Sequence, residues 1–115
     1  MKIQISGIAS ISNPAQKEIV EQAVTSLGRL GADAKCRFAE ETGSAMIQVD
    51  GDSSELPSDW QRALTKVATF ADTCTLVYRR EDDPTYRLTI KKDRFLDMPE
   101  MTETCPGYEW HDPFH

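Results

Sequence analysis

The sequence predicts an α+β fold in which two helices cover one face of an antiparallel sheet. Two stretches place apolar residues at helical spacing, and five others alternate apolar and polar residues as half-buried strands do. Their order along the chain is β-α-β-β-α-β-β. The first six elements are those of a ferredoxin-like βαββαβ sandwich, and the seventh adds a C-terminal strand. The right-handed crossover rule places the first and third strands side by side, the fourth beside the first, and the fifth on that same edge.

The length of 115 residues, with 39% hydrophobic and 28% charged residues, is typical of one soluble domain. We assign residues 1–95 to that domain and residues 96–115 to an irregular, acidic and aromatic tail, whose prolines and glycine break any period. No apolar run approaches the roughly eighteen residues of a membrane span. The N-terminus also lacks the apolar stretch of a signal peptide. The sequence therefore predicts a cytoplasmic protein without membrane contact.

The first helix has clear start and stop signals. Asn13 is suited to the N-cap, Pro14 to the first helical position, and Gln16 to the return bond of a capping box. An apolar stripe follows at spacings of one, three and four, formed by Ile19, Val20, Ala23, Val24, Leu27 and Leu30. Gly31 then supplies a left-handed C-terminal position. We expect the second helix to begin with a capping signal at Ser58 and to end near residue 72.

The strands are predicted from period-two alternation. Residues 2–11 form the first strand, and Gly7 is expected to be a bulge because the apolar phase changes around it. Residues 34–38 and 45–50 form one hairpin, and residues 74–79 and 86–91 form a second hairpin closed by turn residues 81–84.

Acidic residues are concentrated in two segments. Residues 38–61 carry six acids and no base, and residues 96–115 carry five acids and no base. The rest of the chain is mildly basic, although the net charge is −6. This regional acidity differs from the uniform acidity of a DNA mimic, and it favours association with a basic partner.

The sheet alternation predicts one apolar and one basic face. The helix-facing side chains would be Ile3, Ile5, Cys36, Phe38, Ile47, Val49, Leu76, Tyr78, Leu88 and Ile90. The opposite face would carry Lys2, Gln4, Lys35, Arg37, Met46, Gln48, Val77, Arg79, Arg87 and Lys91, with little acid besides Asp50. Such a face suggests nucleic-acid binding through Lys35, Arg37, Arg79, Arg87 and Lys91. The strand aromatics are predicted to face the core, which argues against base stacking on the sheet.

The tail holds the densest group of unusual residues. Cys105, His111 and His115 have a C-x5-H-x3-H spacing that zinc could use, but no second cysteine pair accompanies them. Tyr108, Trp110 and Phe114 are suited to pinning the tail to the domain, and anchoring a partner is the alternative. A metal-dependent enzyme centred on these Cys and His residues is therefore one alternative function.

Other chemistry has weak support. Cys36 and Cys74 are expected to be reduced thiols, since the chain has an odd number of cysteines and no Cys-x-x-Cys. No nucleophile motif or phosphate-binding glycine loop is present, and the acidic loop near residue 55 lacks the ligand ladder of a calcium site. We expect no catalysis and no cofactor.

These observations favour a small, non-catalytic protein that binds another macromolecule. The leading hypothesis is an inhibitor of the immunity or anti-defence type, acting on a basic, nucleic-acid-handling protein. Its expected contact residues are Asp50, Asp52, Glu55, Asp59, Tyr108, Glu109, Trp110 and Asp112. A nucleic-acid-binding domain is the main alternative. The sequence leaves the oligomeric state open.

Overall fold

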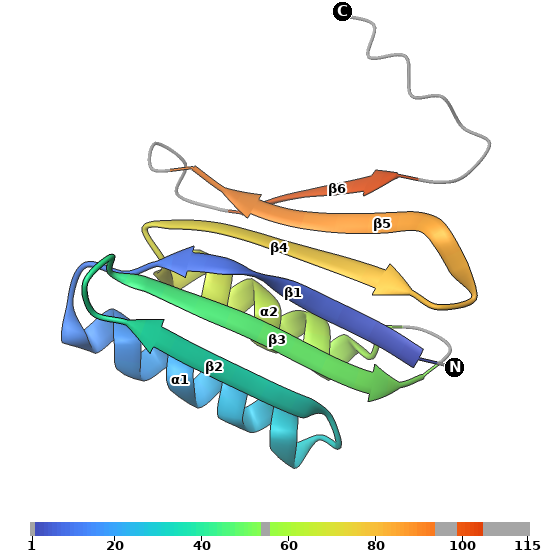
Figure 1. Ribbon diagram of the computed structural model, residues 1–115, viewed down its shortest axis with the longest axis horizontal. Coiled ribbons are helices and arrows are strands. Elements are labelled where there is room, and N and C mark those ends of the chain that lie inside the picture. Colours follow the sequence, from blue (N-terminus) through green and yellow to red (C-terminus); the bar gives the residue numbers. More distant parts are fainter. Residues whose placement is uncertain (1, 54–55, 94–98, 105–115) are drawn as a thin grey trace, which may run out of the picture.

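The computed structural model describes residues 2–53, 56–93 and 99–104. Its elements are β1 (Lys2–Ser10), α1 (Pro14–Arg29), β2 (Asp33–Ala39), β3 (Ser44–Asp52), α2 (Ser58–Phe70), β4 (Thr73–Arg80), β5 (Asp83–Lys92) and β6 (Glu100–Thr104). Figure 1 shows the strands forming one continuous sheet with the helices behind it. The predicted α+β class is confirmed.

The six strands lie in the order β2-β3-β1-β4-β5-β6, and each neighbouring pair is antiparallel. The predicted neighbours of the first five strands are therefore found. β6 was not predicted, because residues 100–104 were assigned to an irregular tail; that assignment is wrong for this segment, which pairs with β5 (Figure 1). The sheet is compatible with a ferredoxin-like arrangement and differs from it by the strands added beyond β4.

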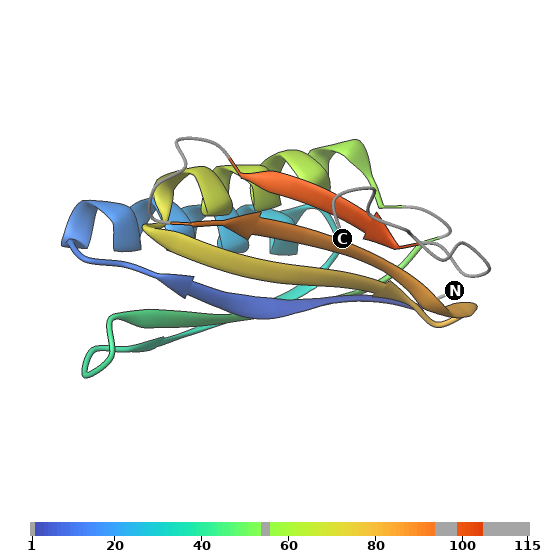
Figure 2. The ribbon, with the colours of Figure 1, turned by 90° about the horizontal axis from the view of Figure 1, so that it is seen from above.

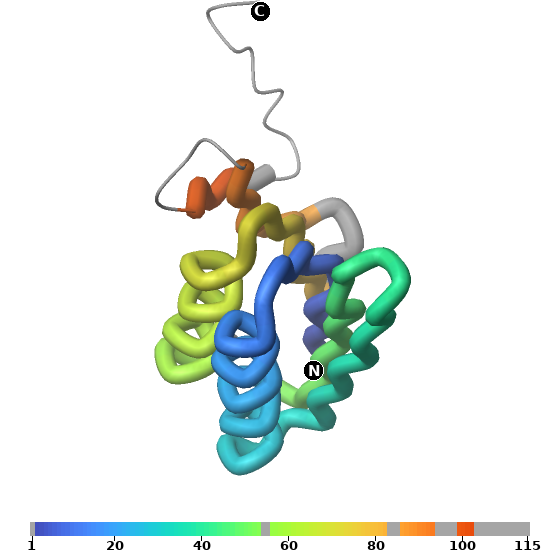
Figure 3. Tube along the Cα trace, turned by 90° about the vertical axis from the view of Figure 1, so that its left-hand side faces the viewer, coloured from blue at the N-terminus to red at the C-terminus, as the bar shows by residue number. Residues whose placement is uncertain are grey.

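Both helices pack on one face of the sheet, as Figures 2 and 3 show. The core lies in this layer between sheet and helices. Its most buried large side chains are Ile3, Ile5, Leu27, Leu64, Leu76 and Ile90. No charged or polar residue of the described chain is buried there. Neither of the two described helices has the length and apolar character needed to cross a lipid bilayer.

β1 is one of the two middle strands and pairs without a register shift on both sides. Every residue from Lys2 to Ser10 has a partner on β3, and the pairing with β4 is also continuous. The predicted bulge at Gly7 is therefore wrong. Glycine is required there for another reason, because a Cβ at this position would collide with the carbonyl oxygen of Thr75. The change of phase after Gly7 instead leaves Ile8 on the exposed face.

The predicted capping box of α1 is confirmed. The Asn13 side chain accepts a hydrogen bond from the Gln16 backbone N–H (2.9 Å), and the Gln16 side chain accepts one from the Asn13 N–H (3.2 Å). Gln16 also joins the two helices, since its Nε2 donates to Phe70 O (3.0 Å) and to Asp72 Oδ1 (2.9 Å). Gly31 adopts the expected left-handed conformation, with φ of 97°.

The predicted capping signal of the second helix is wrong. Ser58 is the first residue of α2, and Pro57 occupies the N-cap without a side-chain hydrogen bond. The other end of α2 is stabilised from the sheet. Lys92 Nζ donates to the carbonyl oxygens of Thr69 (2.6 Å) and Ala71 (2.8 Å). A cation at a helix C-terminus also complements the helix dipole.

Replacing Gly7 with alanine tests the close contact between β1 and β4. We expect Gly7→Ala to lower the free energy of unfolding by about 1–3 kcal/mol, because the strands must separate to admit the new methyl group. Gly28→Ala is the matched control, since nothing lies within 4 Å of a Cβ there and alanine favours the helix. Urea unfolding of both variants measures the difference. Equal stability of the two variants would show that the strands do not approach as described.

Candidate functional site

The sheet face that points away from the helices is uncovered in the described chain, and we call it the open face. It carries the side chains predicted for it. Most of them are exposed, namely Lys2, Gln4, Lys35, Arg37, Met46, Gln48, Arg79, Arg87 and Lys91. The strand pairings arrange these side chains in rows that run across the sheet. The rows determine which charges lie next to each other.

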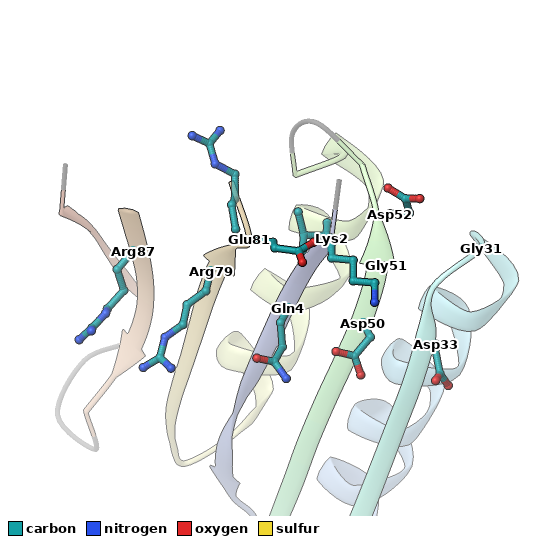
Figure 4. Close-up of a pocket in the computed structure, with 12 residues that line it drawn as sticks. Lys2, Gln4, Gly31, Asp33, Asp50, Gly51, Asp52, Arg79, Glu81 and Arg87 are labelled. Atoms are coloured by element: carbon teal, nitrogen blue, oxygen red, sulfur yellow. The ribbon is translucent and has the colours of Figure 1, made fainter. Parts of the chain in front are cut away.

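One row separates negative from positive charge. Asp33 of β2 lies opposite Asp50 of β3, which lies opposite Gln4 of β1. Gln4 in turn lies opposite Arg79 of β4, and Arg79 lies opposite Arg87 of β5. We call these five residues the charge row; Figure 4 shows their side chains side by side on the open face. Four strand spacings make the row about 19 Å long.

The charge row contains two like-charge pairs. Side chains directly opposite each other on antiparallel strands are close, so both the Asp33–Asp50 and the Arg79–Arg87 pairs are unfavourable. Within the described residues, none of these four side chains forms an ion pair. Gln48 Nε2 donates a hydrogen bond of 3.2 Å to Asp50 Oδ2, which offsets the repulsion of Asp50 by Asp33 less than an ion pair would. The row is therefore a poor arrangement for the stability of the chain itself.

The charge row crosses a hollow of about 880 Å³ at one end of the sheet (Figure 4). Its lining residues include Lys2, Asp52, Arg80 and Glu81 as well as the whole charge row. Lys2 lies opposite Asp52 in the pairing of β1 with β3 and adds a cation to the acidic side. The charge row thus places carboxylates on one side of the hollow and guanidinium groups on the other, and Glu81 adds a carboxylate to the guanidinium side.

A second hollow of about 370 Å³ adjoins the first and shares Gly31 and Asp52 with it. Asp59 and Trp60 of α2 line this second hollow. Together, Asp33, Asp50, Asp52 and Asp59 form what we call the acidic cluster. Asp59 makes an exposed ion pair with Arg62 at 4.0 Å. The pKa of Asp52 is lowered by nearby positive charge, to which Lys2 contributes.

The structure divides the acidic segment predicted as a contact surface. Asp50 lines the first hollow, Asp59 lines the second, and Asp52 lines both. Glu40 and Glu41 lie at the turn between β2 and β3, at the opposite end of these strands (Figure 1). The remaining predicted contact residues, Glu55, Tyr108, Glu109, Trp110 and Asp112, lie outside the described residues.

The residues predicted for nucleic-acid binding share the open face with Asp33 and Asp50 of the acidic cluster. Arg79 and Arg87 are in the charge row, and Lys35, Arg37 and Lys91 lie in the next rows along the strands. The strand aromatics do not join them. Tyr78 is buried, and Phe38 and Tyr86 pack partly buried against the core. The expected absence of a base-stacking platform therefore holds for these three side chains.

Asp33 is the site residue that the sequence prediction missed. The first hairpin strand was predicted to begin at Ala34, but β2 begins at Asp33. Asp33 has the same alternation phase as Lys35 and Arg37, and extending the strand by one residue would have placed it on the open face. Its position opposite Asp50 needed the strand pairing as well, since the two residues are seventeen positions apart.

The candidate metal and thiol groups do not contribute to this site. Cys105, His111 and His115 lie outside the described residues. Among the residues that are described, no group of three or more His, Cys, Asp or Glu side chains is arranged to hold a metal ion. Burial raises the pKa of the Cys36 thiol and raises that of Cys74 to about 12, so both thiols are poor nucleophiles near neutral pH.

Comparison with known proteins adds no family. No protein-family model, no curated protein and no solved structure matches this chain. The functional argument therefore depends on the open face and the acidic cluster.

Repulsion between Asp33 and Asp50 should lower the stability of the chain, and this can be tested. We expect Asp33→Lys to raise the free energy of unfolding by about 0.2–1 kcal/mol, because it replaces repulsion of Asp50 with attraction. Glu41→Lys makes the same change of charge in the turn at the far end of the strands and serves as the control. Thermal or urea unfolding at low salt measures both. A lower stability of Asp33→Lys than of the control would contradict the described pairing.

Proposed function

We propose that this chain is a small, non-catalytic protein that binds a basic protein partner through the acidic cluster. The observation that supports this most directly is the placement of Asp33 opposite Asp50, beside two hollows that Asp52 and Asp59 also line. Four carboxylates from three elements thus line two adjoining hollows at one end of the sheet.

Repulsion within the cluster is the physical reason for partner binding. A cationic side chain of a partner that enters the hollow between Asp33 and Asp50 replaces an unfavourable pair with two attractive ones. Concentrated charge also steers diffusional encounter, which increases the association rate and makes it sensitive to salt.

The more specific form of this proposal is an inhibitor of the immunity or anti-defence type. Such a protein needs a rigid domain and a charged surface complementary to a basic, nucleic-acid-handling target. The two helices and six strands supply the rigid domain, for which we propose the ferredoxin-like class with two added strands. The acidic cluster supplies the complementary surface.

Nucleic-acid binding is the second candidate. It is favoured by the Arg79–Arg87 pair, which lies exposed in the same hollow without an ion pair to another described residue. Two adjacent guanidinium groups can each donate a pair of hydrogen bonds to phosphate oxygens. The acidic half of the charge row opposes this function, because a phosphate backbone that follows the row would meet Asp33 and Asp50.

Affinity capture from a lysate of the host cells tests the proposal. The acid-neutralised variant carries Asp50→Asn, Asp52→Asn and Asp59→Asn, and the control carries Glu18→Gln, Glu40→Gln and Glu41→Gln. We expect the unchanged chain and the control to retain one stoichiometric protein at low salt and to lose it as salt rises. The acid-neutralised variant should bind that protein with an association rate lower by about tenfold or more.

Two results would count against this function. Equal association rates for the acid-neutralised variant and the control would show that the acidic cluster does not attract the partner. Nucleic acid in the eluate without a protein partner would support the second candidate, and Arg79→Glu with Arg87→Glu should then abolish its retention.

A further inference from the structure

We infer that the open face also binds a second copy of this chain, face to face, with a two-fold axis that runs along β1. This inference goes beyond the proposed function, because it concerns self-association and not a different partner. It starts from the symmetry of the charge row. Reading from β2 to β5, the row is negative, negative, neutral, positive and positive, with Gln4 at its centre (Figure 4).

A rotation of 180° about β1 turns the open face over and exchanges its two sides. Asp33 then faces Arg87 of the second copy, and Asp50 faces its Arg79. The reciprocal contacts occur on the other side of the axis, so all four like-charge neighbours gain an opposite charge. The two Gln4 amides meet at the axis, where each can both donate and accept a hydrogen bond. Isologous interfaces require this kind of self-complementarity.

The charge row also excludes the other two-fold axis within the sheet plane. A rotation about an axis along the row would place Asp33 on Asp33 and Arg87 on Arg87 of the second copy. Like charges facing each other across an interface are strongly unfavourable. The row therefore both attracts the second copy and determines its orientation.

Exposed apolar side chains lie on the same face. Ile8 of β1 is 50% exposed, and its neighbour Met46 of β3 is 56% exposed. Val77 of β4 is half-buried one row closer to Gln4. Because Ile8 belongs to the axis strand, it would meet Ile8 of the second copy near the middle of the face. An apolar centre with charged surroundings is typical of homodimer interfaces.

The row on the other side of the charge row fits this arrangement less closely. Lys2 would face Lys2 of the second copy, and Asp52 would face its Glu81, so both contacts join like charges.

The basic rows farther along the strands also bring like charges together. Arg37 of β2 would face Lys91 of the second copy, which is a like-charge contact. Glu100 of β6 lies directly opposite Lys91 in the same sheet, so Arg37 also meets a carboxylate there.

The open face is large enough for a specific dimer. Five strands, from β2 to β5, overlap about an axis along β1, so the shared face is about 19 Å wide and, with the nine residues of β1, about 30 Å long. Burial of this area on both copies removes about 1,100 Å² from solvent, which exceeds the roughly 1,000 Å² expected of a specific interface. A partner bound at the acidic cluster would compete with the second copy, because both use Asp33 and Asp50.

Charge exchange between two variants tests this inference. The positive-row variant carries Asp33→Arg and Asp50→Arg, and the negative-row variant carries Arg79→Glu and Arg87→Glu. Light scattering during size-exclusion chromatography should give twice the mass of one chain for the unchanged protein at low salt. Each variant alone should elute with the mass of one chain. An equimolar mixture should restore the doubled mass, and native mass spectrometry should identify one copy of each variant.

Two control variants make the same charge changes away from the open face. Glu40→Arg with Glu41→Arg matches the positive-row variant, and Arg62→Glu with Lys66→Glu matches the negative-row variant. Both controls should remain dimeric.

A monomeric unchanged chain, or doubled mass for either row variant alone, would overturn the inference. So would a mixture of folded row variants that stays monomeric, with circular dichroism confirming their folds. The proposed function fails separately, through equal partner association rates of the acid-neutralised variant and its control.

Discussion

The structure depends on the uninterrupted pairing of β1 with β3 on one side and β4 on the other. This register sends Ile3 and Ile5 toward the helices and Gln4 toward the open face. It also aligns strands that are distant in the sequence, so that two aspartates and two arginines fall into one row with Gln4 between them. A slip of one residue would reverse every face and destroy both the core and the charge row. Gly7 permits this register by allowing β1 and β4 to approach closely.

The two faces of the sheet follow opposite rules. The helix face is closely packed and apolar, and the links from Gln16 and Lys92 to the end of α2 hold the helix layer in place. The open face places like charges next to each other, which lowers the stability of the isolated chain. Sequences commonly violate local rules of stability where a surface has a function. The charge row is such a violation. Opposite charges on a partner or on a second copy would offset the repulsion between its like charges.

Local signals in the sequence predicted most of the fold. The capping box at Asn13 and the alternation of the strands identified α1 and both hairpins because each depends on neighbouring residues. β6 was missed because Met101 is its only large apolar residue, and its pairing with the edge of β5 is a tertiary contact. Asp33 was missed because strand ends are weakly specified by sequence. The charge count over residues 38–61 also could not show that Glu40 and Glu41 lie far from the acidic cluster.

The central claim is that the two halves of the charge row do not neutralise each other within one chain. A double-mutant cycle on Asp50→Asn and Arg79→Gln, measured by urea unfolding of dilute protein at low salt, tests it most directly. The account predicts additive effects within about 0.5 kcal/mol, because Gln4 separates the two side chains by a full strand. A coupling of about 1 kcal/mol or more would contradict the account, since the opposite charges would then already stabilise each other inside the molecule.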